Sequence, residues 1–245
     1  MSRGVLYIVF GDNFIQEMKY SAESVKKHNP DLHITVFSDR SVECEFIDSV
    51  QIMNEVRHLR PKIDYIGLAP YDQTLFLDTD TIINHSLEDL FGILEKYDLA
   101  LVHDLARKRR KFFDSIPEYG QIPYSFSEVN TGVMAFNKNE KVIKLFEAWR
   151  ENFYKYYDVV PWDQPSFRVS LWKSDASLYV LPVEYNIRSK ANREKQVRFH
   201  HEFGEEHLKP RIYHMHADTR INQGTYEVNS LDEALKICID NHLPY

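Results

Sequence analysis

The feature that most constrains this chain is a short apolar run that ends in two carboxylates, Thr74-Leu75-Phe76-Leu77 followed by Asp78-Thr79-Asp80. A short apolar run before a charged break is typical of a buried parallel strand. Because residues i and i+2 of a strand point to the same face, Asp78 and Asp80 are expected to project together. Two ionised carboxylates crowded at a strand end repel each other unless a cation lies between them, and oxygen ligands suit Mg²⁺ or Mn²⁺. The competing interpretation is a strand followed by an Asp-rich turn.

Strands and helices alternate around this motif, which predicts an α/β fold with a mostly parallel central sheet flanked by helices. The strands are expected at 5–10, 33–37, 49–53, 74–77 and 99–103, and the helices at 13–28, 59–68 and 87–96. Further along we expect strands at 129–136, 178–183 and 211–216, helices at 139–156, 164–172 and 231–241, and loops at 106–121 and 189–206. The chain has no internal repeat and no low-complexity linker, so its 245 residues are predicted to form a single domain.

Composition narrows the function classes. A net charge of −7 argues against nucleic-acid binding, which needs a basic face. The two cysteines have no zinc-site spacing and form no disulfide framework, which favours a reducing compartment. No apolar stretch approaches the roughly 20 residues of a transmembrane helix, and the start of the chain lacks a signal-peptide pattern. We therefore expect a cytoplasmic protein.

Polar residues recur at places where a phosphate or sugar site needs them. Lys62 lies sixteen positions before Asp78, on the preceding predicted helix. Asn130-Thr131-Gly132 interrupts an apolar strand, where a buried polar pair costs about 1–3 kcal/mol unless it is hydrogen-bonded. The sequence Trp162-Asp163-Gln164 opens a helix, and Asp163 is either the N-cap of that helix or a functional carboxylate.

The last part of the chain adds histidines and an arginine. His214 and His216 share one face of a predicted strand, so either could bind a metal ion. Arg220 follows and could meet an anion. Arg188 is expected in a structural ion pair more than on the acceptor side, and the basic run 107–111 is expected in a solvated loop.

The ordered set of motifs resembles the GT-A glycosyltransferases, in particular glycosyltransferase family eight, to which glycogenin belongs. The resemblance implies a GT-A, Rossmann-like nucleotide-diphospho-sugar transferase fold, with 1–104 as the nucleotide-binding half and 105–245 as the acceptor and catalytic half. It departs from the family pattern at Thr131, where Ser is usual, at Ala217, where Gly is usual, and at Arg220, where Lys is usual.

The resemblance also assigns roles to residues. Metal-ligand positions fall on Asp78, Asp80 and either His214 or His216, and catalytic positions on Asp163, Gln164 and Asn130. The positions that bind the nucleotide sugar are Val9, Phe10, Gly11, Phe14, Lys62, Asp78, Thr79, Thr131, Gly132, Ala217 and Arg220.

The implied activity is transfer of a sugar from a nucleotide sugar, most often a UDP-sugar, with Mn²⁺ or Mg²⁺ and with retention of configuration. The acceptor could be a glycan, a protein or a small molecule, and a homodimer is possible. Two alternatives are a haloacid-dehalogenase-like phosphohydrolase, which also uses a strand ending in Asp-x-Asp, and a GT-A-like binding protein without turnover. The phosphohydrolase is disfavoured because Ile82 stands where Thr or Val is usual and a later acidic pair is missing.

Overall fold

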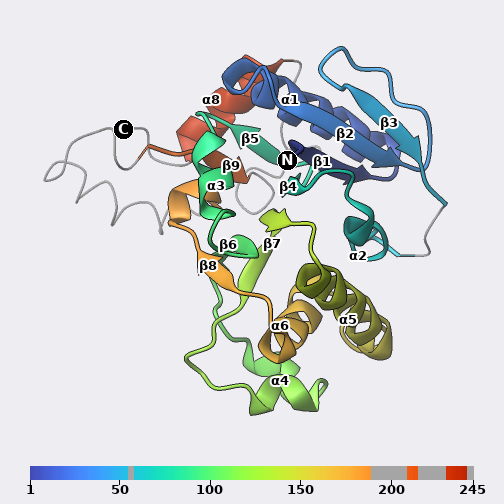
Figure 1. Cartoon of the computed structure of the whole chain (residues 1–245), viewed down its shortest axis with the longest axis vertical. Coiled ribbons are helices and arrows are strands. Elements are labelled where there is room, and N and C mark those ends of the chain that lie inside the picture. Colours follow the sequence, from blue (N-terminus) through green and yellow to red (C-terminus); the bar gives the residue numbers. More distant parts are fainter. Residues whose placement is uncertain (55–57, 189–208, 215–229, 242–245) are drawn as a thin grey trace, which may run out of the picture.

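The central element is a seven-stranded sheet whose strands lie in the order β3-β2-β1-β4-β7-β6-β8 (Figure 1). The computed structural model describes residues 1–54, 58–188, 209–214 and 230–241. The strands are β1 (Arg3–Val9), β2 (His33–Ser38), β3 (Ser49–Ile52), β4 (Gln73–Leu77), β6 (Leu99–His103), β7 (Val129–Asn137) and β8 (Leu178–Val180).

The sheet is mostly parallel, as predicted, but one strand runs against its neighbours. The pairs β1–β2, β1–β4, β2–β3 and β6–β8 are parallel, whereas β7 is antiparallel to both β4 and β6. Because β7 is antiparallel to both of its neighbours, the strands that the first half of the chain gives to this sheet all run in one direction, including β6. That strand reaches the sheet only through β7, which the second half of the chain supplies.

Helices cover both faces of the sheet, so successive residues of β1 alternate between two hydrophobic cores, one on each face. Val5, Tyr7 and Val9 pack beneath α1 (Asp12–His28) and α3 (Glu88–Ile93). Leu6 and Ile8 face a second core that is shared with α2, α5 and α6. These three helices span Lys62–Tyr65, Glu140–Tyr156 and Asp163–Lys173. Burial on both faces explains why β1 is a continuous apolar run.

A second, two-stranded sheet brings a late segment of the chain back to the carboxylates. It pairs β5 (Thr81–Ile83) with β9 (Ile212–His214) in antiparallel register, with Thr81 opposite His214. Its apolar side chains pack with Leu231 and Ala234 of α8 (Leu231–Asn241), which lies beside α1 (Figure 1). The position of His214 is thus fixed by pairing with the residues that directly follow Asp80.

Several predicted elements are shorter in the structure. The helix expected at 59–68 is the four-residue α2 followed by a 3₁₀ turn, η1 (Ile66–Leu68), and that at 87–96 is reduced to α3. The strand expected at 178–183 ends at Val180 and gives way to η3 (Val183–Tyr185). The loop expected at 189–206 lies outside the described residues.

The basic segment is more ordered than a solvated loop. It contains η2 (Arg110–Phe112) and is followed by α4 (Pro117–Gln121). The Lys108 ammonium donates to the carbonyl of Ile122, and Arg109 pairs with Asp104 at 2.8 Å. The solvated-loop interpretation is therefore wrong for Lys108 and Arg109. Within the described part of the chain, no helix combines the length and the apolar character that a membrane crossing requires.

Candidate active site at the carboxyl end of β4

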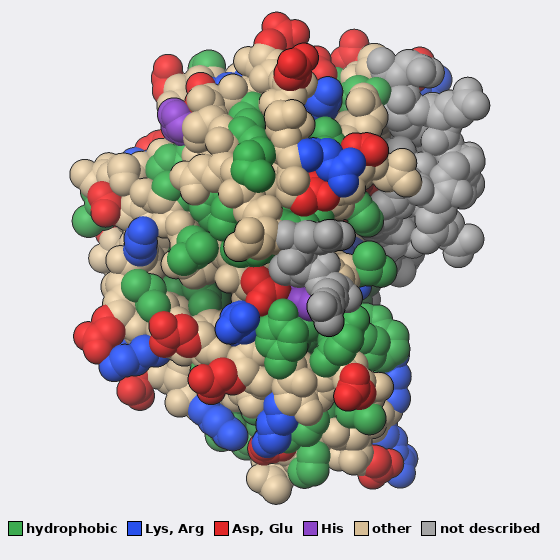
Figure 2. All heavy atoms as spheres, turned by 90° about the vertical axis from the view of Figure 1, so that its right-hand side faces the viewer, with side chains coloured by type: hydrophobic (Ala, Val, Ile, Leu, Met, Phe, Trp, Pro, Cys, Tyr) green, Lys and Arg blue, Asp and Glu red, His purple; other side chains and the backbone are tan. Residues whose placement is uncertain are grey.

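A pocket of about 600 Å³ lies where β1 and β4 end and where β7, α6 and β9 approach them. Acidic, basic and histidine side chains gather at a hollow near the middle of the face shown in Figure 2. The predicted site residues that line the pocket are Val9, Phe10, Phe14, Lys62, Asp78, Thr79, Asp80, Asn130, Thr131, Gly132, Asp163, Gln164 and His214. Gly11 is not among the lining residues, and Ala217, Arg220 and His216 lie outside the described residues.

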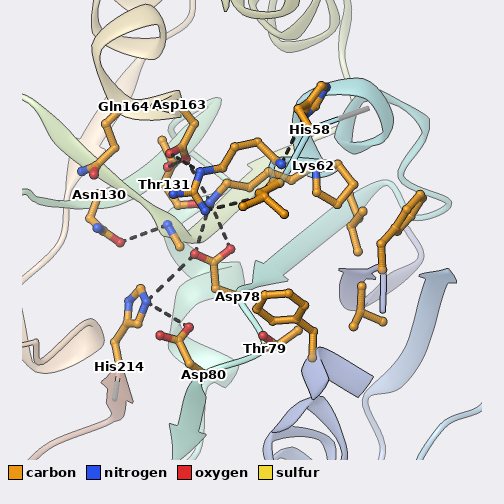
Figure 3. Close-up of a pocket in the computed structure, with 18 of the residues that line it drawn as sticks. His58, Lys62, Asp78, Thr79, Asp80, Asn130, Thr131, Asp163, Gln164 and His214 are labelled. Atoms are coloured by element: carbon orange, nitrogen blue, oxygen red, sulfur yellow. Dashed lines mark hydrogen bonds and ion pairs between the residues drawn. The ribbon is translucent and has the colours of Figure 1, made fainter. Parts of the chain in front are cut away.

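Three of these residues form a cluster suited to a metal ion. Asp78, Asp80 and His214 each offer one ligand atom, and these atoms lie within 4.8 Å of one another. The His214 Nε2 atom is 3.1 Å from Asp80 Oδ1 and 4.0 Å from Asp78 Oδ2 (Figure 3). The chain turns between β4 and β5, as the Asp-rich-turn interpretation expects. The Asp78 and Asp80 side chains nevertheless point toward the same place, as expected from their spacing. Carboxylate and imidazole ligands together fit a hard or borderline divalent ion such as Mn²⁺.

Gly132 is the residue that lets the cluster close. A β-carbon at this position would lie 2.3 Å from His214 Cε1 and 2.7 Å from Asp78 Oδ2, closer than side chains can approach. The Gly132 carbonyl also accepts a 2.7 Å hydrogen bond from the Asp78 amide, which holds the turn against β7. The backbone at this position thus occupies space that any side chain would take from two of the candidate metal ligands.

Lys62 lies between two carboxylates in the centre of the pocket (Figure 3). Its ammonium nitrogen is 3.0 Å from Asp78, 3.1 Å from Asp163 and 3.2 Å from the carbonyl of Thr131. Burial alone would lower the pKa of Lys62, but the charges of Asp163 and Asp78 outweigh it and raise the pKa. Lys62 is therefore a permanent cation directly beside the candidate metal cluster.

Asp163 is a buried carboxylate rather than a helix cap. The N-cap of α6 is Trp162, and no side chain caps the helix, so the capping interpretation is wrong. Asp163 instead accepts a 2.5 Å hydrogen bond from the Thr131 hydroxyl and lies 3.4 Å from Arg60. Burial favours its neutral form, but the charges of Lys62 and Arg60 and this hydrogen bond hold its pKa well below the usual range. The group is ionised at neutral pH.

Gln164 is fixed by a residue that the sequence interpretation missed. Asp104 is fully buried just after β6, and it accepts hydrogen bonds from Gln164 Nε2 at 2.7 Å and from Arg188 at 3.0 Å. Burial would raise the pKa of Asp104, but these bonds and the charge of Arg109 lower it. Arg188 forms a structural ion pair with Asp104, as predicted, and it also lines the pocket. Asp104 follows an apolar strand just as Asp78 does, and that shared pattern was the available signal.

Aromatic side chains also line the pocket. Phe10 stacks on Tyr65 with ring centroids 5.8 Å apart, and Phe14, which is partly exposed, also lines the pocket. Thr79 points away from the carboxylates and donates a 2.7 Å hydrogen bond to Glu17 of α1. A pocket with both aromatic and charged lining residues suits a ligand with a planar base at one side and phosphates at the other.

The fold and this pocket define a class of protein, the nucleotide-sugar glycosyltransferases with a GT-A-like fold. The family model described as nucleotide-diphospho-sugar transferase matches residues 73–226, which is more than half of the chain. The chain belongs to this family. The matched range includes the candidate metal cluster and Asp163 but not Lys62 or β1.

Comparisons with individual proteins agree with this assignment. Glucoside xylosyltransferase 1 of Gallus gallus is 25% identical over 138 residues, which cover 49% of this chain and 31% of that protein. The chain thus matches about a third of the length of this curated relative.

Solved glycosyltransferases share the fold at low sequence identity. The galactosyltransferase LgtC, solved with donor and acceptor sugar analogues, matches with a TM-score of 0.64 and 14% identity, covering 98% of this chain and 97% of that one. GlyE of Streptococcus pneumoniae gives a TM-score of 0.62 and 16% identity, with coverage of 98% and 60%. Mouse xyloside xylosyltransferase 1 gives 0.57 and 13%, with coverage of 87% and 97%.

Proposed function

We propose that this chain transfers a sugar from a UDP-sugar to an acceptor with retention, and that it uses Mn²⁺ or Mg²⁺ held by Asp78, Asp80 and His214. The observation that carries the proposal is the convergence of these three side chains at a pocket that also holds Lys62 and Asp163. The nucleotide-binding half, 1–104, supplies both aspartates and Lys62, and the half 105–245 supplies His214 and Asp163.

The charged end of the pocket would bind the diphosphate of the donor. A divalent ion held there supplies positive charge against the departing diphosphate. Lys62 adds a second positive charge, and it can turn from Asp78 toward a phosphate oxygen while keeping its contact with Asp163. As the resemblance implies, we propose that His216 is the alternative to His214 as a metal ligand and that Ala217 and Arg220 bind the nucleotide sugar.

The other predicted residues line the path from base to sugar. The base would stack on the aromatic part of the lining, where Val9, Phe10 and Phe14 line the pocket and Gly11 stands at the N-cap of α1. Thr79 and Thr131 border the phosphate region, and Thr131 also orients Asp163.

Asp163 is the carboxylate best placed to act at the sugar. Its negative charge is secured by Lys62 and Arg60, which suits electrostatic stabilisation of an oxocarbenium-like centre. The same two cations reduce its strength as a nucleophile, so we favour stabilisation over a covalent intermediate. Gln164 is anchored to Asp104 through its nitrogen. No donor from the described part of the chain reaches its oxygen, which could therefore accept a hydrogen bond from a sugar hydroxyl.

The phosphohydrolase alternative has less support. The family match concerns transfer of nucleotide-linked sugars, and the pocket has aromatic as well as polar lining residues. A small sugar phosphate would leave the aromatic part of the lining uncovered.

A screen of nucleotide sugars for donor hydrolysis, with Mn²⁺ or with EDTA, tests the proposal. We expect slow hydrolysis of a UDP-sugar that requires the metal ion and is abolished in Asp80→Ala. Asp175→Ala, which removes an exposed carboxylate outside the pocket, is the matched control and should behave like the unmodified protein.

Thermal unfolding gives a readout that is independent of turnover. Mn²⁺ with UDP should stabilise the unmodified protein and the control by about 2.7 kcal/mol at a ligand concentration 100 times Kd. Asp80→Ala should gain no stabilisation, while its own stability in EDTA is nearly unchanged or raised because carboxylate repulsion is relieved. Equal metal dependence in Asp80→Ala and the control would refute the assignment.

A further inference from the structure

A chain of buried amides leads from the backbone of β7 to the ring of His214. The Gly132 amide donates to Asn130 Oδ1 at 3.0 Å, and Asn186 Nδ2 donates to the same oxygen at 2.7 Å. Asn186 Oδ1 lies 2.9 Å from His214 Nδ1. Asn130, Asn186 and His214 are all at most 4% exposed, so water does not compete for these contacts.

The donors and acceptors in this hydrogen-bonded series of amides allow only one arrangement of hydrogen atoms. A backbone amide can only donate, so the Asn130 atom that faces Gly132 must be the oxygen. The Asn186 atom that faces this oxygen must then be the amide nitrogen, which leaves the oxygen of Asn186 opposite the imidazole. His214 Nδ1 must therefore carry a proton. Turning either amide over would place two acceptors or two donors against each other.

This arrangement determines which ring nitrogen faces the carboxylates. In the neutral ring, a proton on Nδ1 leaves the lone pair on Nε2. Nε2 is the atom that lies 3.1 Å from Asp80 Oδ1 and belongs to the cluster with Asp78. Three electron pairs then converge on one point, which is the state that a cation requires.

Backbone hydrogen bonds also fix the position of Asn186 relative to His214. The Ile187 amide donates to the carbonyl of Ile212, and the His214 amide donates to the carbonyl of Ile187, each at 2.9 Å. The Asn186 amide closes η3 by donating to the carbonyl of Val183 at 2.9 Å. Asn186 and His214 are therefore held in adjacent segments of backbone that hydrogen-bond to each other.

We propose that Asn186 is a positioning residue for the metal site: together with Asn130 and the Gly132 amide, it holds His214 in the tautomer whose Nε2 atom can bind the ion. The inference rests on the proposed function, since it names the residue that prepares a metal ligand. It also gives Asn130 a second role, because its oxygen belongs to this chain of amides while its nitrogen can still meet a sugar hydroxyl. Residues that orient a metal-bound histidine typically change metal affinity 10- to 100-fold when they are replaced.

The first test needs neither a metal ion nor a variant of Asn186. A long-range ¹H–¹⁵N spectrum of the metal-free protein, at a pH where the ring is neutral, distinguishes the two tautomers. The signal of His214 is assigned by its absence in His214→Gln. We expect the proton on Nδ1, and a proton on Nε2 would overturn the proposal.

The second test measures Mn²⁺ affinity by calorimetry without nucleotide. Asn186→Leu, which keeps the size and removes both hydrogen bonds, should weaken binding 10- to 100-fold. Asn29→Leu is the matched control, because it removes a buried amide that, within the described ranges, bonds only backbone carbonyls and the Leu87 amide and does not line the pocket. It should lose stability and keep its affinity.

Asn186→Asp separates positioning from simple support of the fold. Its carboxylate still accepts from Nδ1 but cannot donate to Asn130, so it should keep the tautomer and bind Mn²⁺ more tightly than Asn186→Leu. Equal affinity in the unmodified protein and Asn186→Leu would overturn the proposal, as would equal loss in both Asn186 variants. If the unmodified protein carries the proton on Nδ1 but binds no Mn²⁺, the tautomer assignment stands and the proposed metal dependence fails.

Discussion

Replacing Gly132 by alanine should disable the candidate metal site through a single methyl group. The added carbon would lie 2.3 Å from His214 Cε1, whereas ordinary van der Waals contact begins at 3.4 Å. The imidazole or the strand must therefore move by about 1 Å, and the Asp78 carboxylate must also move, because its Oδ2 atom would lie only 2.7 Å from the added carbon.

The structure leaves little room for that movement. The His214 ring is held by Asn186, and its backbone is held in β9 opposite Thr81. Overpacking of this kind costs about 1–3 kcal/mol of stability. A displacement of about 1 Å at a reacting centre can cost about 10²-fold in rate, so we expect at least that loss in metal-dependent donor hydrolysis.

Three measurements on Gly132→Ala check this reasoning: Mn²⁺ affinity, the rate of donor hydrolysis, and unfolding by urea. Gly92→Ala is the matched control, because a β-carbon at Gly92 in α3 meets nothing within 4 Å. The control should be as active as the unmodified protein and more stable by about 0.4–1 kcal/mol, since alanine favours a helix. Unchanged Mn²⁺ affinity and turnover in a folded Gly132→Ala would refute the account of the site.

Two further variants test the buried carboxylates. If Asp163 acts at the sugar and not in the metal cluster, as proposed, Asp163→Asn should reduce turnover of the nucleotide sugar by about 10²-fold or more while Mn²⁺ affinity changes little; equal losses in both quantities would contradict that division. Burial raises the pKa of Glu128; one oxygen of its carboxylate accepts from Tyr119, and the other has no hydrogen-bond partner among the residues that the structure describes. Ionisation of Glu128 therefore lowers the free energy of unfolding as the pH rises above the unfolded pKa of about 4.3. Glu128→Gln should add stability of the order of 1 kcal/mol at pH 7, and this gain should disappear below about pH 4. Urea denaturation at both pH values checks this, and a gain that does not depend on pH would count against it.

Much of the fold could be predicted because its strands are buried on both faces. Burial of this kind leaves continuous apolar runs, and β1, β2 and β4 were predicted to within a few residues. The antiparallel placement of β7 could not be predicted in the same way. Its apolar pattern fits either direction, and the pairing of β6 with β7 depends on contacts between residues 26 to 37 positions apart.

The residues of the candidate site likewise fall into those that the sequence predicted and those that it did not. Residues in recognisable motifs, such as Asp78 and Asp163, were predicted and are brought together in one pocket. Arg60 and Asn186 were missed as site residues because each is a single polar residue in an irregular segment, where no spacing marks it. Their significance comes from the partners that the fold provides, Asp163 for the first and His214 for the second.

The small sheet of β5 and β9 would couple ion binding at the proposed site to the pairing of two segments that lie far apart in the sequence. Asp80 and His214 are 134 positions apart in the sequence, yet they meet because Thr81 pairs with His214. Such a long-range contact is slow to form, and a fragment that stops short of β9 would keep the two aspartates but lack the third proposed ligand. Saturation with the ion should therefore slow amide exchange in β9 as strongly as in β4, joining the two ends of the fold into one cooperative unit.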